Sequence, residues 1–402
     1  MKKLIAFCMP VLLPLLLAAC ASVPTVQHPG HLLDDKLFTA SSERISAEDV
    51  FAVSDAMRRY LKVDIASLLQ AKGPQQGLIE ALNGKSQLQV QYDSATTRNA
   101  AQTFDERAGN CLSLVIMTAA LARELGMSVH FQSVFVDETW SRSGGLYFTI
   151  GHVNLTVGRR YRDIKSRIDD NIMITIDFNP PMENKSYQTW TIKEPTVLAM
   201  FMNNRSAEAL ARGQINDAYW WVREAIKQDP AFLSAYNTLG VVYRRNGNSA
   251  AAEQTLNYAL ARDPANSQIM SNLAMVLNDT GRVAEAKILT DKVERRQPFA
   301  PFHFHTLGTE AMQMGDFKTA RDMFQRELAR DPYNHEFHFG LAGAFARLGD
   351  MVQSKRHLAI AQDFSTTRRE HDLYAAKLER LKAYTRRDHL ICIEGQAAKP
   401  CS

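Results

Sequence analysis

Residues 234–264 have the sequence SAYNTLGVVYRRNGNSAAAEQTLNYALARDP, and this stretch decides the fold of the C-terminal half. Apolar residues recur at helical spacing on both sides of Gly247, which predicts two helices joined by a short turn. The same pattern returns every 34 residues. Each unit has a proline at its end, a glycine in its turn and a small residue after that turn: Pro230, Pro264, Pro298 and Pro332; Gly213, Gly247, Gly281, Gly315 and Gly349; Ala218, Ala252, Ala286, Ala320 and Ser354.

A period of 34 residues is typical of the tetratricopeptide repeat, and one unit of this chain resembles that repeat nearly position for position. The resemblance implies an all-α solenoid of helix pairs whose concave face binds a protein or peptide partner. We expect five repeats over residues 196–364, then a capping helix and tail over residues 365–402. The first repeat departs from the pattern at Arg205 and Ser206, where the family usually has Leu and Gly. The resemblance rests on Tyr236, Leu239, Gly240, Tyr243, Ala252, Ala259 and Pro264.

The N-terminal half changes its hydrophobic period along the chain, which predicts an α+β domain over residues 46–192. Ser46, followed by two acidic residues, is typical of a helix start, and apolar residues then recur at helical spacing. Two further helices are predicted near residues 78–82 and from Cys111 to Gly126. Strands follow, because β-branched and aromatic residues alternate there. They are expected at residues 129–136, 146–157 and 172–178. Helices followed by strands predict helices packed on an antiparallel sheet.

The segment Arg107-Ala-Gly-Asn-Cys-Leu-Ser113 comes directly before an apolar helix. It resembles the nucleophile motif of transglutaminase-like proteins, a superfamily with a papain-like site. In that family a Cys at a helix start is followed by a His on one strand and an Asp on the next. Cys111, His152 and Asp177 occur here in that order, each on the expected element. The resemblance covers about residues 90–182 and implies that these three residues form a catalytic site.

Such a site would act on an amide bond as a peptidase, amidase or transamidase, with hydrolysis favoured over protein crosslinking. The positive end of the helix dipole stabilises a thiolate at Cys111. His152 would carry the proton, and Asp177 would orient the imidazole. The Cys111 amide is one expected oxyanion donor, and the residues do not identify the second. Trp140 is a candidate for the cleft wall, and we expect no metal or cofactor.

A second interpretation of these residues involves no catalysis. Cysteines on apolar helices are often simply buried, and an aspartate before Phe-Asn-Pro-Pro can start a turn. The N-terminal domain would then be a docking module of an assembly lipoprotein that works through its repeats. A peptidoglycan-associated scaffold is a related alternative.

Residues 1–19 have the features of a bacterial lipoprotein signal peptide. Two lysines precede an apolar run that is short for a membrane-spanning helix. The run ends in Leu17-Ala-Ala-Cys20, which resembles a lipobox. The resemblance implies cleavage before Cys20 and its lipidation, and the absence of Asp directly after it favours an outer-membrane anchor facing the periplasm. Residues 20–45 would hold the lipidated cysteine and a tether. A plain secretory signal is the alternative.

The chain has five cysteines and a nearly balanced charge. In an oxidising compartment Cys392 and Cys401, nine positions apart, are candidates for a disulfide. Cys8 leaves with the signal peptide, so Cys111 is the unpaired thiol. The net charge is +4, and removing the two lysines of the signal peptide leaves 45 basic and 43 acidic residues, or +2. This balance argues against a nucleic-acid partner.

Overall fold

The computed structural model describes residues 29–83, 88, 90–143, 146–158, 173–178 and 188–394. The predicted signal peptide, Cys8, Cys20 and Cys401 lie outside these residues, and the side chain of Cys392 is also not described. The lipid anchor and the disulfide therefore stay predictions. Within the described part of the chain, every helix is too short or too polar to span a membrane.

Helices open the N-terminal domain, as predicted, although the first one starts later than expected. It begins after Ser54, whose hydroxyl group accepts a hydrogen bond from the Met57 amide at 3.2 Å. The predicted start at Ser46 instead precedes a turn. The helices are α1 (Asp55–Arg59), which continues through a π-helical turn (Tyr60–Asp64), α2 (Ala66–Asn83), α3 (Ala100–Glu106) and α4 (Cys111–Glu124). Every residue of α4 from Cys111 to Ala122 is buried, so this helix is the centre of the domain.

An antiparallel sheet with the order β5-β4-β3-β6 packs against α4. Leu155 and Val157 of β4 are fully buried on the side that faces the helix core. The predicted sequence of helices followed by an antiparallel sheet is thereby confirmed. The strands are β3 (Ser128–Ser143), β4 (Leu146–Gly158), β5 (Ile174–Ile176) and β6 (Thr189–Ile192).

Five helix pairs follow within residues 188–394, one for each predicted repeat. They are α5 (Glu194–Ala211) with α6 (Ile215–Gln228), α7 (Leu233–Arg245) with α8 (Ser249–Arg262), α9 (Ser267–Asp279) with α10 (Val283–Arg296), α11 (His303–Met314) with α12 (Phe317–Leu328), and α13 (His335–Arg347) with α14 (Met351–Asp363). α15 (Arg368–Glu394) then covers the last pair with Tyr374 and Leu378.

Small residues let the two helices of a repeat approach closely, as the pattern predicts. A Cβ atom at Gly240 would lie 2.5 Å from Leu256 on the partner helix. The ring of Phe324 on α12 lies between Gly308 and Gly340, where Cβ atoms would approach it to 2.8 and 2.7 Å. Glycine at these positions is therefore a packing requirement.

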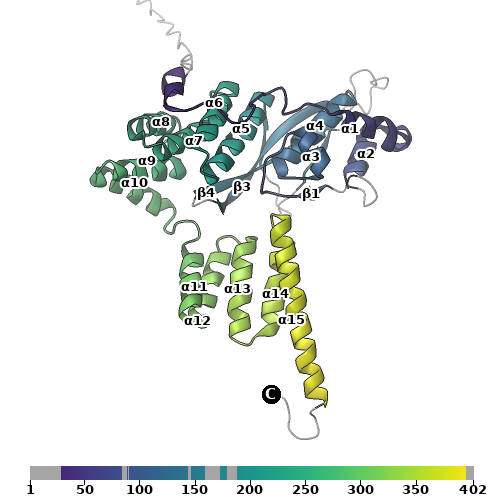
Figure 1. The fold of residues 1–402 in the computed structure, drawn as a ribbon, viewed down its shortest axis with the longest axis vertical. Coiled ribbons are helices and arrows are strands. Elements are labelled where there is room, and N and C mark those ends of the chain that lie inside the picture. Colours follow the sequence, from purple (N-terminus) through teal and green to yellow (C-terminus); the bar gives the residue numbers. More distant parts are fainter. Residues whose placement is uncertain are drawn as a thin grey trace, which may run out of the picture.

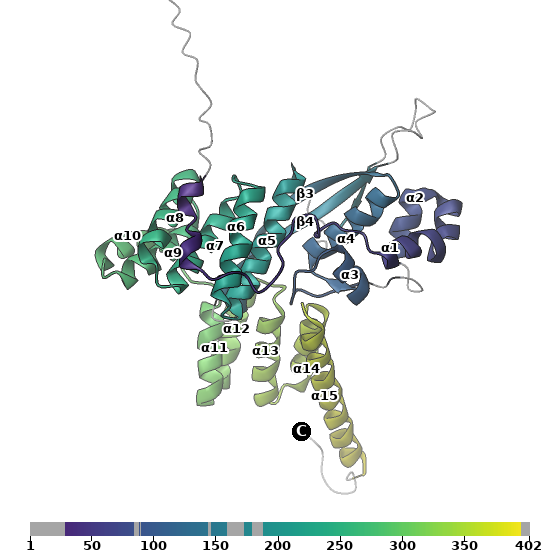
Figure 2. The same ribbon diagram turned by 45° about the horizontal axis from the view of Figure 1, so that its top comes forward.

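The stack of repeats is divided between α10 and α11 (Figures 1 and 2). Within residues 188–394, these two helices do not pack on each other as the other successive helices do. We call α5–α10 the first array and α11–α15 the second array. Val283 and Ile288 on α10 are consequently 63% and 57% exposed, because no following helix covers them. The spacing of the repeats does not reveal this break.

The connection between the arrays explains the change of direction. Two prolines lie in it, and Phe302 adopts a left-handed backbone conformation with φ of 61°. That conformation costs about 1–2 kcal/mol for a residue other than glycine. Burial of the Phe302 ring offsets this cost, since the residue is 2% exposed and packs against Phe337 with ring centroids 5.0 Å apart. The Arg142 guanidinium of β3 covers the same ring at 4.7 Å and pairs with Glu336 at 2.7 Å.

Residues 29–43, part of the segment expected to be a tether, pack along the first array (Figure 2). The Phe38 ring stacks on Tyr219 of α6 with centroids 3.9 Å apart. The carboxylate of Asp217 accepts hydrogen bonds from the backbone N–H and the hydroxyl group of Ser42, each at 2.7 Å. The N-terminal segment is therefore part of the folded structure from at least Pro29 onward.

Candidate active site

The N-terminus of α4 carries Cys111. Asn110 is the N-cap residue, and its Oδ1 atom accepts hydrogen bonds from the backbone N–H and the hydroxyl group of Ser113, each at 2.9 Å. Cys111 is therefore the first residue of the helix, where unpaired N–H groups create a positive potential. The cysteine is 8% exposed, and its Sγ atom lies 3.9 Å from the carbonyl oxygen of Gly151 on β4.

His152 and Asp177 contact each other from neighbouring strands. His152 lies on β4, and Asp177 directly follows β5. The Nε2 atom of His152 lies 2.8 Å from Oδ1 and 2.9 Å from Oδ2 of Asp177. Asn154 points to the same side of β4 as His152 and donates a hydrogen bond of 3.2 Å to Oδ2. Two residues of one strand thus fix the carboxylate.

His152 contacts Asp177, and the preceding residue Gly151 contacts Cys111. Burial alone lowers the pKa of His152, but the hydrogen bond with Asp177 and the nearby Cys111 side chain outweigh burial and raise the pKa to about 9. Because Nε2 faces Asp177, Nδ1 is the ring nitrogen available to Cys111. The three residues singled out in the sequence therefore lie together in the structure.

Tyr92 also lies at this site, although the sequence did not single it out. β1 (Gln91–Tyr92) pairs in parallel with β2 (Ala108–Gly109), which leads directly to Cys111. Burial, and then the Cys111 side chain, raise the pKa of Tyr92, whereas a hydrogen bond from the Cys111 backbone lowers it. The Tyr92 side chain thus lies close to Cys111. No motif marks this tyrosine, and only the strand pairing reveals it.

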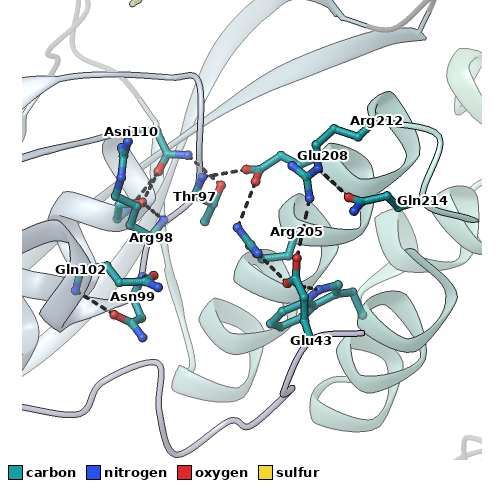
Figure 3. Close-up of polar contacts among 12 residues, drawn as sticks. Glu43, Thr97, Arg98, Asn99, Gln102, Asn110, Arg205, Glu208, Arg212 and Gln214 are labelled. Atoms are coloured by element: carbon teal, nitrogen blue, oxygen red, sulfur yellow. Dashed lines mark hydrogen bonds and ion pairs between the residues drawn. The ribbon is translucent and has the colours of Figure 1, made fainter. Parts of the chain in front are cut away.

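A polar network fixes the loop before α4 (Figure 3). The side-chain amide of Asn110 donates a hydrogen bond of 2.9 Å to Thr97 Oγ1. The backbone N–H of Thr97 donates one of 2.7 Å to Glu208 Oε1, and the backbone N–H of Arg98 donates one of 2.9 Å to Ser113 Oγ. Glu208 belongs to α5, so the N-cap of α4 is connected to the first repeat.

The second array contacts the same domain near Tyr92. The backbone N–H of Ser94 donates a hydrogen bond of 2.7 Å to the carbonyl oxygen of Thr366, in the turn before α15. Trp140, the candidate for the cleft wall, lines a cavity of about 270 Å³ with Phe302 and Arg330, and this lining does not include Cys111. Among the described side chains, no group of three or more His, Cys, Asp and Glu is arranged to hold a metal ion.

Comparisons with known proteins concern the repeats. A tetratricopeptide repeat family matches residues 186–356. A TPR repeat-containing protein of Pseudomonas aeruginosa is 28% identical over 132 residues, which are 32% of this chain and 22% of that protein. The type IV pilus assembly protein PilF of the same organism is 27% identical over 121 residues, or 30% of this chain and 48% of PilF.

A solved structure of Pseudomonas aeruginosa PilF is also similar, with 19% identity and a TM-score of 0.27, covering 47% of this chain and 94% of that one. The matched part of this chain spans about a fifth of the first curated relative and about half of PilF. Residues 186–356 are therefore a tetratricopeptide repeat region, which is a protein–protein interaction module.

Proposed function

We propose that the protein is an envelope lipoprotein that cleaves or transfers an amide bond at a transglutaminase-like Cys111-His152-Asp177 site. The observation that carries this proposal is the position of His152, which contacts Asp177 at 2.8 Å and directly follows Gly151, whose carbonyl oxygen lies 3.9 Å from the Cys111 thiol. In the proposal, Cys20 carries the lipid and holds the protein at the outer membrane, and the repeats recruit a protein substrate or partner.

The residues suit a two-step reaction. The Cys111 thiolate attacks the carbonyl carbon, and the C–N bond breaks as the His152 imidazolium gives its proton to the departing amine. Water then attacks the thioester while His152 takes a proton from it, which releases the carboxylic acid and restores the thiolate–imidazolium pair. Asp177 holds the ring in position and stabilises its charged form during both steps.

The developing oxyanion needs hydrogen-bond donors at the nucleophile. The Cys111 amide is the first, as in the prediction from sequence. The Tyr92 hydroxyl group, which lies close to Cys111, is the candidate for the second donor in this proposal. In this proposal the reaction is hydrolysis and not crosslinking, as in the prediction from sequence.

The first test is the rate of Cys111 alkylation by iodoacetamide, followed by mass spectrometry of the peptide that contains Cys111. We expect fast labelling between about pH 6 and pH 7 that slows at least about tenfold in His152→Ala. His130→Ala is the matched control, because His130 is an exposed histidine on the neighbouring strand β3. Equal rates in His152→Ala and His130→Ala would refute the proposal.

A second candidate function is a non-catalytic assembly factor that works through the repeats alone. It is favoured by the similarity to a relative named as a pilus assembly protein. Cys111→Ala separates the two candidates. If a strain that lacks the protein is fully restored by the Cys111→Ala chain, the assembly function is correct, whereas a catalytic function predicts no restoration.

A further inference from the structure

The first repeat contacts the loop that presents Cys111. Glu208 lies on α5 and points toward the N-terminal domain, where its Oε1 atom accepts a hydrogen bond of 2.7 Å from the backbone N–H of Thr97 (Figure 3). Thr97 Oγ1 in turn accepts a hydrogen bond of 2.9 Å from the side-chain amide of Asn110. Asn110 caps α4, whose first residue is the cysteine. Three side chains thus connect the repeats to the nucleophile.

We propose that Glu208 is a positioning residue for Cys111 and that the repeats control the reactivity of the thiol through it. This inference rests on the proposed function, since it concerns the same nucleophile. The Asn110 amide caps α4 only when its oxygen faces the helix and its nitrogen faces Thr97. The hydrogen bond from the Thr97 backbone N–H to Glu208 holds Thr97 in place, and Thr97 Oγ1 is the acceptor that faces the Asn110 nitrogen. The carboxylate therefore supports the capping orientation of Asn110.

The orientation of Glu208 is itself set by the first array and the N-terminal segment. Arg205, one turn earlier on α5, lies 3.5 Å from Glu208 Oε2 and 2.6 Å from Glu43 Oε2. The Arg205 guanidinium also lies over the Trp221 ring of α6, at 5.3 Å. The Glu208 side chain is 17% exposed, and its charge is balanced by Arg205. A partner that moves α5 or displaces residues 29–43 would move this carboxylate.

The second array holds the other end of the same short segment. Ser94, three positions before Thr97, donates its backbone N–H to the Thr366 carbonyl oxygen at 2.7 Å. The segment between β1 and α3 is therefore fixed to the second array at Ser94 and to the first array at Thr97. It begins next to Tyr92, whose side chain lies close to Cys111. In this proposal, binding of a partner to the repeats changes the geometry around the Cys111 thiol.

The test compares three substitutions on α5 in the full chain. Glu208→Ala removes the acceptor for Thr97, and Glu208→Gln restores an oxygen at the same place. Glu194→Ala is the matched control, because Glu194 pairs with Arg123 in the last turn of α4, at the opposite end from Cys111. The readout is the pH profile of Cys111 alkylation by iodoacetamide, with circular dichroism to confirm that each variant is folded.

We expect Glu208→Ala to slow labelling about fivefold to tenfold near neutral pH and to move the profile to higher pH, since one helix cap is lost. Glu208→Gln should recover most of the rate, and Glu194→Ala should keep it. Labelling of Glu208→Ala at the wild-type rate, or equal slowing in Glu194→Ala, would overturn the inference. The two failures are distinguishable: if His152→Ala slows labelling and Glu208→Ala does not, only the role of Glu208 is wrong. If only Glu208→Ala slows labelling, the proposed Cys111–His152 pair is wrong, whereas the positioning role of Glu208 is supported.

Discussion

Replacing Asp177 with Asn tests the central contact of the site, because it keeps the shape of the side chain and removes its charge. In the folded protein the pKa of His152 is raised from 6.5 to about 9, against the effect of burial, by the hydrogen bond with Asp177 and by the nearby Cys111 side chain. The difference between these two pKa values corresponds to a free energy of roughly 3 kcal/mol by which the folded protein favours the charged imidazolium. A carboxylate at hydrogen-bond distance raises the pKa of a histidine by about 1 to 3, so Asp177→Asn should lower it by that amount.

The sign of the effect on stability follows from linkage. The folded-state pKa of His152 lies above its unfolded value, so the contribution to stability is complete below about pH 6.5 and is lost as the pH rises through about 9. Asp177→Asn should therefore lower the melting temperature strongly near pH 6. Well above pH 9, the two proteins should differ only by the weakened hydrogen bond.

The direct assay is a histidine NMR titration, with the His152 resonance assigned by its absence in His152→Ala. We expect one imidazole to titrate near 9 in the unsubstituted protein and at lower pH in Asp177→Asn. Cys111→Ala should also lower the value, because the thiol is the second group that raises it. The reasoning is wrong if His152 titrates near its ordinary value, or if Asp177→Asn leaves its titration unchanged.

Three further predictions concern the second array. Gly340→Ala places a Cβ atom 2.7 Å from the Phe324 ring and should destabilise the protein by about 1–3 kcal/mol in thermal unfolding. Gly343→Ala on the same helix is the control and should be tolerated, because its Cβ atom would lie 3.6 Å from the Met312 side chain. Burial lowers the pKa of His357 to about 4, so this residue contributes stability above about pH 6.5 that is lost as the pH falls toward 4. The melting temperature of the protein should therefore fall between pH 6.5 and pH 4, and it should fall less in His357→Leu. Arg142→Ala removes the ion pair with Glu336 on α13 and the guanidinium that lies over the Phe302 ring. Limited proteolysis of the α10–α11 connection should then become several times faster. An unchanged rate would show that Arg142 does not hold the second array in place.

The repeats were predictable because their information is local and periodic. Proline, glycine and small residues at a 34-residue step specify two helices and their contact, and the structure has a helix pair at each predicted unit. The bend between α10 and α11 was not predictable from this period. It depends on Phe302, whose left-handed conformation is stabilised by Phe337 and by Arg142 from a distant strand. Neither contact can be recognised from the repeat pattern of the sequence.

The same distinction applies to the candidate site. Cys111, His152 and Asp177 stand in short motifs on three different elements, and the resemblance of these motifs to transglutaminase-like proteins implied that they would lie together. Glu208 could not be found in that way, because it lies 111 residues after Thr97 and its position follows only from the packing of α5. In a repeat sequence it also has the ordinary interpretation of a solvated charge on a helix.

The packing places the principal division of the chain at the α10–α11 connection, not at the end of the predicted α+β domain. Buried apolar residues form one continuous core from Leu32 through α4 and the sheet to Ala286 on α10. The second array has separate cores, one around Phe324 and one around Leu358 and α15. The first three repeats thus belong to the same core as the nucleophile, and removing them would expose the face of α4 that packs against α5. The second array meets that core through polar contacts such as Arg142 with Glu336, so it is the part whose position a binding partner can change at the lowest cost in buried apolar surface.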